Sequence, residues 1–73
     1  MTNKLIQLFS TFQRLNIHFF YSKLEGGCVG LRYDNKVRNK VNKIAIDHGF
    51  CIVQEHEYKY TYKKTSWAQT III

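Results

Sequence analysis

Residues 50–62, from Phe50 to Tyr62, are FCIVQEHEYKYTY, and this stretch decides which fold the rest of the chain must complete. Its residues alternate in character. Phe50, Ile52 and the three tyrosines share one parity, while the other parity is mostly polar or charged. Alternation with a period of two is typical of a β-strand. The stretch therefore predicts a long strand, followed by a turn at residues 63–66 and a last strand at 67–73.

A straight strand of this length does not fit inside the domain. At roughly 3.3 Å per residue the stretch would span about 43 Å, whereas a chain of this size folds to a globule about 30 Å across. Two solutions remain open: either a β-bulge falls near Gln54–Glu57, or the hairpin of residues 58–73 projects as an arm. A bulge would also shift the alternation by one residue, placing Phe50 and Ile52 in the core and turning the tyrosines outward.

The segments before this stretch predict a helix, two strands and a second helix. Apolar residues at helical spacing predict a helix over residues 3–16, capped by Thr2 or Asn3. Strands are expected at 17–24 and 28–33 around a turn at 25–27, and Gly30 indicates a bulge or a close backbone approach. Asp34 and Gly49 then bound a second helix.

The order helix-strand-strand therefore occurs twice. The two halves resemble each other weakly, with LNIHF at 15–19 against HGFCI at 48–52. Each predicted helix has an apolar stripe that needs covering, and one sheet covers both stripes economically. We expect a small α+β fold, a single domain over residues 1–73, in which both helices lie on one face of an antiparallel sheet.

Length and charge limit the function. The chain has 73 residues, which is too short for a Rossmann unit or a (β/α)₈ barrel. It carries 11 Lys and Arg against five Asp and Glu, for a net charge of +6, and both halves are basic. A folded basic surface favours polyanions such as nucleic acid, acidic membrane or an acidic protein face. The alternative is that this net charge serves only to keep a small domain in solution.

Cysteine content and hydropathy indicate a cytoplasmic protein. Cys28 and Cys51 are too few for a disulfide-dependent secreted domain, so we expect reduced thiols, although one bridge between them stays open. No apolar stretch approaches the roughly 18 residues of a membrane span. The first residues also lack the pattern of a secretory signal. We therefore expect no membrane partner.

The strongest candidate site is the aromatic and basic row around residues 58–64, with Trp67 just beyond it. Alternate tyrosines make a flat platform on which bases stack, and the neighbouring lysines pair with phosphates. The predicted nucleic-acid-binding residues of this row are Tyr58, Lys59, Tyr60, Tyr62, Lys63 and Lys64. Arg32 and Tyr33 would extend it if their strand lies alongside. The alternative is structural, because cross-strand aromatic pairs stabilise sheets on their own.

A row of lysines on the second helix is the supporting candidate. Lys36, Lys40 and Lys43 are spaced to share one helix face. Against a phosphate backbone they would add salt-dependent affinity without reading sequence. The alternative is an ordinary solvated face. One ligand is not expected to reach both this row and the tyrosines, because the two rows lie on different elements.

Catalysis and metal binding have little support. Neither the cysteines nor the histidines have close-paired zinc spacing, and His56 points away from its flanking glutamates on a strand. We therefore expect no metal, no cofactor and no enzyme. A metal-free ribonuclease that uses His48 or His56 is the remaining catalytic hypothesis.

These observations predict a small basic module that binds nucleic acid through phosphate contacts and tyrosine stacking. The alternative is a protein-binding inhibitor or adaptor, of the kind carried by phages and mobile elements, whose aromatic patch binds a host protein. The apolar residues Ile71, Ile72 and Ile73 must be covered, either by the domain's own sheet or by a second copy. A homodimer through the C-terminal hairpin is the expectation for the second case.

Overall fold

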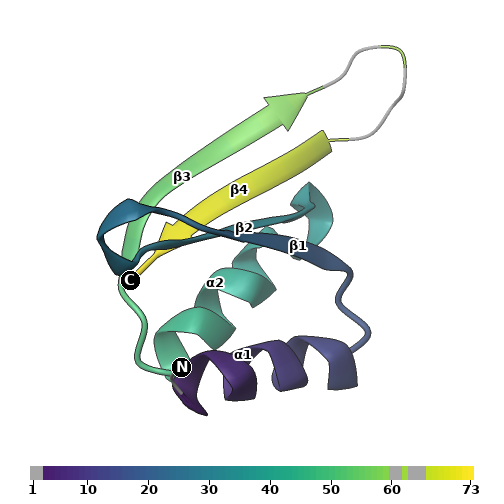
Figure 1. Cartoon of the computed structure of the whole chain (residues 1–73). Helices are drawn as coiled ribbons and strands as arrows, with labels where there is room; N and C mark the ends of the chain where they lie inside the picture. The colour runs from purple at the N-terminus through teal and green to yellow at the C-terminus, as the bar shows by residue number, and fades with distance from the viewer. Residues whose placement is uncertain (1–2, 60–61, 63–65) are drawn as a thin grey trace.

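The computed structural model describes residues 3–59, 62 and 66–73, and it confirms the expected α+β fold (Figure 1). The sheet has the order β1-β2-β4-β3, with every neighbouring pair antiparallel. In the described part of the chain no helix is long and apolar enough to cross a membrane. The elements are α1 (Asn3–Arg14), β1 (Phe19–Lys23), β2 (Val29–Asp34), α2 (Arg38–Asp47), β3 (Ile52–Lys59) and β4 (Ser66–Ile72), with short 3-10 turns η1 (Glu25–Gly27) and η2 (Asn35–Val37).

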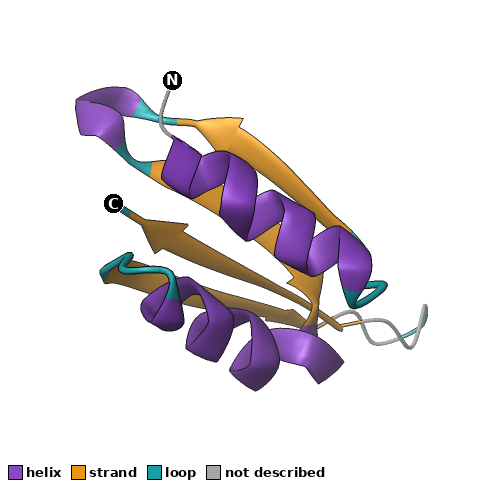
Figure 2. Cartoon of the chain, turned by 90° about the horizontal axis from the view of Figure 1, so that it is seen from below, coloured by secondary structure: helices purple, strands orange, loops and turns teal. Residues whose placement is uncertain are grey.

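Both helices lie on the same face of the sheet, as predicted (Figures 1 and 2). The strand order places the first strand of each helix-strand-strand half at an edge and the second strand at the centre. Ile72 at the end of β4 is therefore fully buried within the domain's own sheet. The domain's own sheet thus covers one of the three apolar C-terminal residues, whereas Ile71 is half-buried and Ile73 is 52% exposed. A homodimer through this hairpin stays a prediction.

The helix α1 ends at Arg14, two residues earlier than predicted. Asn16 adopts a left-handed backbone conformation with φ 58°. The amide of Ile17 then donates to the carbonyl of Phe12 at 2.9 Å. This 6→1 bond beside a left-handed residue is the Schellman stop, and it brings the apolar Ile17 back against Phe12 in the core.

The helix α2 ends in the same way. Gly49 has φ 85°, and the amide of Phe50 donates to the carbonyl of Ala45 at 3.0 Å. The weak similarity between residues 15–19 and 48–52 therefore marks two equivalent turns from helix to strand. At the other end Asp34 caps as predicted, accepting from the Lys36 amide at 2.9 Å, but it caps η2 rather than α2 itself.

The core lies between the sheet and the two helices. The predicted apolar stripes face inward, and alternate residues of the central strands meet them. Tyr33 and Thr70 are buried among these apolar side chains. The core consists of Leu5, Leu8, Phe12, Ile17, Val29, Leu31, Tyr33, Val41, Ala45, Phe50, Ala68 and Ile72.

The predicted β-bulge is present in β3, slightly nearer the start of the strand than expected. Ile52 pairs with Ile72, but the next pair is Gln54 with Ile71, so the register shifts at Val53. The extra residue is 56% exposed. Ile52 packs against the core before the shift. After it, Gln54 and the alternate residues that follow face away from the helices, which is the change of parity that a bulge produces.

Candidate functional site

The sheet has one face that neither helix covers, which we call the open face (Figure 1). Its side chains alternate with core residues along each strand. Arg32 stands between Leu31 and Tyr33, which are both buried, and Trp67 precedes buried Ala68. By strand alternation and register, the strand residues on this face are Phe20, Ser22, Gly30, Arg32, Asp34, Gln54, His56, Tyr58, Trp67, Gln69 and Ile71.

Four of these side chains form a continuous band across all four strands, which we call the aromatic strip: Phe20, Arg32, Trp67 and Tyr58. Phe20 and Arg32 are direct partners between β1 and β2, and Trp67 and Tyr58 are direct partners between β4 and β3. Two diagonal contacts link these pairs. The rings of Phe20 and Trp67 have centroids 6.2 Å apart, and the Arg32 guanidinium carbon lies 5.2 Å from the Tyr58 centroid.

The strip is accessible to a ligand. Phe20 is 55% exposed, Arg32 is exposed, and Tyr58 and Trp67 are half-buried. Single exposed apolar residues are ordinary, but contiguous exposed apolar patches mark interaction sites. The strip therefore has the composition and the access of a binding surface.

Histidines flank the strip at both edges of the sheet. The His18 ring meets Phe20 edge-on at 5.3 Å, and the His56 ring lies 6.2 Å from Tyr58. Both histidines are exposed. Each lies two residues before its partner ring along the chain, so they add rings beside the outer members of the strip.

Gly30 adds no side chain to the open face. A Cβ at this position would lie 3.2 Å from the Gln69 Nε2 atom and 3.3 Å from the Ser22 hydroxyl. The β1–β2 register runs through Gly30 without a shift. Of the two expectations for this glycine, the structure therefore shows the close approach and not the bulge.

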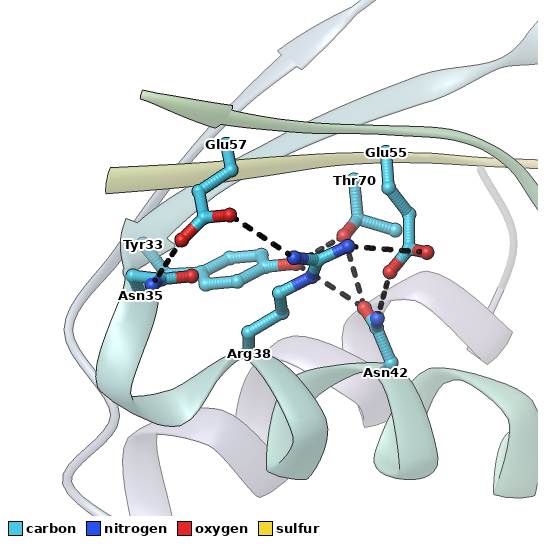
Figure 3. Close-up of polar contacts among 7 residues, drawn as sticks. All are labelled: Tyr33, Asn35, Arg38, Asn42, Glu55, Glu57 and Thr70. Carbon is cyan, nitrogen blue, oxygen red and sulfur yellow. Dashed lines mark hydrogen bonds and ion pairs between the residues drawn. The ribbon is translucent and has the colours of Figure 1, made fainter. Parts of the chain in front are cut away.

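The glutamates of β3 face the helix side (Figure 3), and strand alternation places Tyr58 on the opposite face. Arg38 of α2 reaches across to both of them, with N–O distances of 3.5 Å to Glu55 and 3.8 Å to Glu57. Asn35 also donates to Glu57 at 2.7 Å. These contacts offset part of the negative charge of the two acids and hold them away from the open face.

The inner end of this network is buried. The hydroxyls of Tyr33 and Thr70 contact each other, and both donate toward the Asn42 side-chain oxygen, at 3.2 and 2.9 Å (Figure 3). Asn42 in turn donates to Glu55. Burial raises the pKa of the Tyr33 phenol above its ordinary value. The expectation that Tyr33 extends the ligand surface is therefore wrong, because this ring lies in the core.

The structure divides the predicted tyrosine and lysine row. Tyr58 lies on the open face, but Lys59 has the opposite parity, and its ammonium lies 4.0 Å from Glu57. Tyr62 is 91% exposed beyond the end of β3. The predicted residues Tyr60, Lys63 and Lys64 lie outside the described residues.

The lysines predicted on the second helix lie in the other layer. Lys36 in η2 and Lys40 and Lys43 in α2 are all exposed. Since α2 packs on the covered face of the sheet (Figure 2), Lys40 and Lys43 belong to the layer opposite the open face, whereas Lys36 lies in η2 directly after β2. One flat contact does not reach both surfaces.

Phe20 was not singled out by the sequence, although it is the most exposed aromatic ring of the strip. Residues 17–24 predict a strand, but so many of them are apolar that alternation does not separate the covered face from the open one. Phe20 differs from its neighbour Phe19, which packs against α1 through contacts with Phe9 and Phe12. Only the β1–β2 register, which pairs Phe20 with exposed Arg32, shows which ring faces outward.

The histidines of the ribonuclease hypothesis lie apart. His48 sits between the helices, where its Nδ1 donates to the Ile44 carbonyl at 2.8 Å and its Nε2 lies 3.1 Å from the Thr11 hydroxyl. His56 lies on the open face. Among the described residues, no three His, Cys, Asp or Glu side chains are grouped to hold one metal ion.

A cavity of about 380 Å³ lies away from the open face, beside the start of α1 and the turn η1. Its walls are mainly apolar, with Lys4 and Lys23 among them. The Lys4 ammonium already donates to the Gly49 carbonyl at 2.7 Å and lies 4.6 Å from the Phe50 ring centroid. One hydrogen of the Lys4 ammonium is therefore already used within the domain.

The open face thus combines exposed rings, one cation within the strip and no helix above it. Asp34, the one acid among the described strand residues of this face, is turned to its own backbone as the cap of η2. Comparison with protein families, curated proteins and solved structures finds no match for this chain, so the chemistry of this face is the ground on which a function is proposed.

Proposed function

We propose that this protein binds nucleic acid through its open face. The observation that supports the proposal is the aromatic strip, in which Phe20, Trp67 and Tyr58 surround Arg32 on an uncovered sheet. Bases stack on such rings at about 1–3 kcal/mol each. A guanidinium supplies a planar cation for the phosphate groups.

The distribution of charge supports the same proposal. The chain has a net charge of +6, and two of its five acids are paired with Arg38 on the helix side. On the open face itself Arg32 is the cation and Asp34 the acid among the described strand residues, so the long-range attraction for a polyanion comes from the net charge of the whole chain. The exposed α2 lysines add long-range attraction from the other layer, because a basic protein steers polyanions toward itself.

Fluorescence anisotropy tests the proposal directly. Labelled single-stranded and duplex oligonucleotides of about 20 nucleotides, longer than one site, are titrated with the protein. We expect binding at low salt that weakens steeply between about 50 and 200 mM salt, because phosphate contacts release counterions. No binding of DNA or RNA in any form at the lower salt concentration would refute the proposal.

A protein partner is the second candidate, and the exposure of Phe20 is the observation that favours it. Tyr, Trp and Arg dominate hot spots in protein interfaces, and three members of the strip are of these types. An inhibitor or adaptor of a host protein would use the same surface. Affinity capture from nuclease-treated cell extract, with the Phe20→Ala variant as control, separates the candidates: one stoichiometric protein lost with the variant favours this second function.

A cytoplasmic location belongs to the proposal. Both cysteines are free thiols, Cys28 half-buried and Cys51 exposed. Reduced thiols are typical of proteins kept in the cytoplasm. Mass spectrometry of protein isolated under alkylating conditions measures their state in cells, because only a free thiol takes up the alkyl group.

A further inference from the structure

We infer that the open face selects single-stranded nucleic acid, laid across the strands from β1 to β3 with its bases against the aromatic strip. This inference rests on the proposed function and names the class of ligand for the same site. It follows from the width of the sheet, the orientation of the rings and the position of the lysines, which are taken in turn.

The width of the open face does not suit duplex DNA. Four strands at about 4.8 Å spacing place the outer backbones about 14 Å apart. The major groove is about 12 Å wide and admits a helix or a two-stranded ribbon. A four-stranded sheet therefore cannot enter the groove. In an intact duplex the base faces are also stacked on one another, so the strip has no ring to stack on.

The rings of Phe20 and Trp67 are not stacked on each other, although the His18 ring meets Phe20 edge-on. Phe20 and Trp67 are 6.2 Å apart with an interplanar angle of 50°, so neither ring covers the other. The Arg32 guanidinium lies over Tyr58, where it offers both a plane for a base and a charge for a phosphate. A sheet with such aromatic positions holds about two or three unpaired bases. The strip matches that number, with stacking positions at Phe20, Trp67 and the Arg32–Tyr58 pair.

The lysines indicate where a duplex would bind instead. Lys40 and Lys43 present their charges on α2, in the layer opposite to the strip. Phosphate backbones of a duplex can contact such a row without any unstacking. Single-strand binding and duplex binding therefore depend on different residues, and substitutions separate them.

Trp67 provides an intrinsic signal for the test, since it is the single tryptophan of the chain. Oligothymidylate, oligouridylate and a mixed-sequence duplex are titrated while both tryptophan emission and the anisotropy of a labelled strand are followed. We expect the single strands to quench the emission and to bind at least about tenfold more tightly than the duplex, a difference of about 1.4 kcal/mol. The two single strands also separate DNA from RNA as the preferred form.

Two variants test the assigned contacts. Phe20→Leu keeps an apolar strand residue but removes the ring, and we expect a loss of about 5- to 150-fold in single-strand affinity, the equivalent of one stacked base. Arg32→Gln should lower the slope of log affinity against log salt by about 0.7, the value of one single-strand phosphate contact. Ile46→Ala, which shortens an exposed apolar residue on α2, is the matched control and should change neither value.

The outcomes distinguish the inference from the proposed function. Equal affinity for duplex and single strand, or unchanged single-strand affinity in folded Phe20→Leu protein, would overturn the inference while nucleic-acid binding stands. A loss of binding in Lys40→Glu/Lys43→Glu with Phe20→Leu unaffected would overturn it too and place the site on α2. Binding of no oligonucleotide at low salt would overturn both.

Discussion

Asn42 joins the buried and exposed parts of the polar network, and its replacement by alanine tests how that network is satisfied. The hydroxyls of Tyr33 and Thr70 each have one hydrogen to donate. The Asn42 oxygen accepts from these hydroxyls, which are also in contact with each other. Without Asn42 the two hydroxyls can form a single bond between themselves, so one buried hydrogen has lost its acceptor in the cluster.

The expected cost follows from this count. A buried donor left without a partner costs about 1–3 kcal/mol. Loss of the Asn42–Glu55 hydrogen bond adds about 0.5–1.5 kcal/mol, and the better helix propensity of alanine returns about 0.5 kcal/mol. We expect Asn42→Ala to lower the free energy of unfolding by about 2 kcal/mol, which corresponds to a fall in Tm of about 8–16 °C for a domain of this size.

Thermal and urea unfolding followed by far-UV circular dichroism measure this loss. Asn39→Ala is the matched control, because Asn39 lies on the same helix with an exposed side chain and should stay within about 0.5 kcal/mol of the wild type. If Asn42→Ala unfolds within the same margin, the buried hydroxyls do not depend on Asn42 and the reasoning is wrong.

Three further changes test other parts of the structure. Burial raises the Tyr33 pKa, so the folded state keeps a phenol proton that the unfolded chain releases above about pH 10, and the stability of the wild type falls as the pH rises past that value. The Tyr33→Phe variant lacks this proton, so the difference in Tm between the variant and the wild type should shrink in that pH range. A difference in Tm that stays constant with pH contradicts this. Gly49→Ala should lower the free energy of unfolding in urea by at least about 1–2 kcal/mol, since φ is 85° and the new Cβ would lie 3.1 Å from the Lys4 side chain. Gly26→Ala is the control for backbone strain alone, because Gly26 has φ 76° and open space around it. A Gly49→Ala protein that unfolds at the same urea concentration as the wild type would refute the account. Arg38→Ala should cost less than about 1 kcal/mol, because its ion pairs are partly exposed; a larger loss in urea unfolding would show that the pairs act as a buried network.

The local features of this fold were predictable because each is encoded over a few neighbouring residues. The apolar stripes of both helices, the turn at Glu25–Gly27 and the stop at Gly49 follow from periodicity and backbone preference. Length alone required either a bulge in the long strand or a projecting hairpin, since a straight strand exceeds the domain, and the structure shows the bulge in β3. The end of α1 was missed because Asn16, unlike glycine, adopts a left-handed conformation only with the support of its surroundings.

The candidate site was only partly predictable. Tyr58 and Arg32 were identified from composition, and both lie on the open face. Tyr33 was misplaced, and Phe20 was overlooked. For both residues, the type of residue said less than the face of the sheet on which its side chain lies. In a strand whose residues are mostly apolar, the sequence does not show which alternate residues face the core.

The sequence by itself determined the elements, their order and the basic charge, because these depend on residues close together in the chain. Only the tertiary structure decided that β4 lies between β2 and β3, that Phe20 meets Trp67, and that Arg32 reaches Tyr58. These contacts join residues up to 47 positions apart. The physical reason is that strand pairing is chosen by the burial of whole faces, so the register that hides Leu31, Ala68 and Ile72 also sets which rings stand together on the open face.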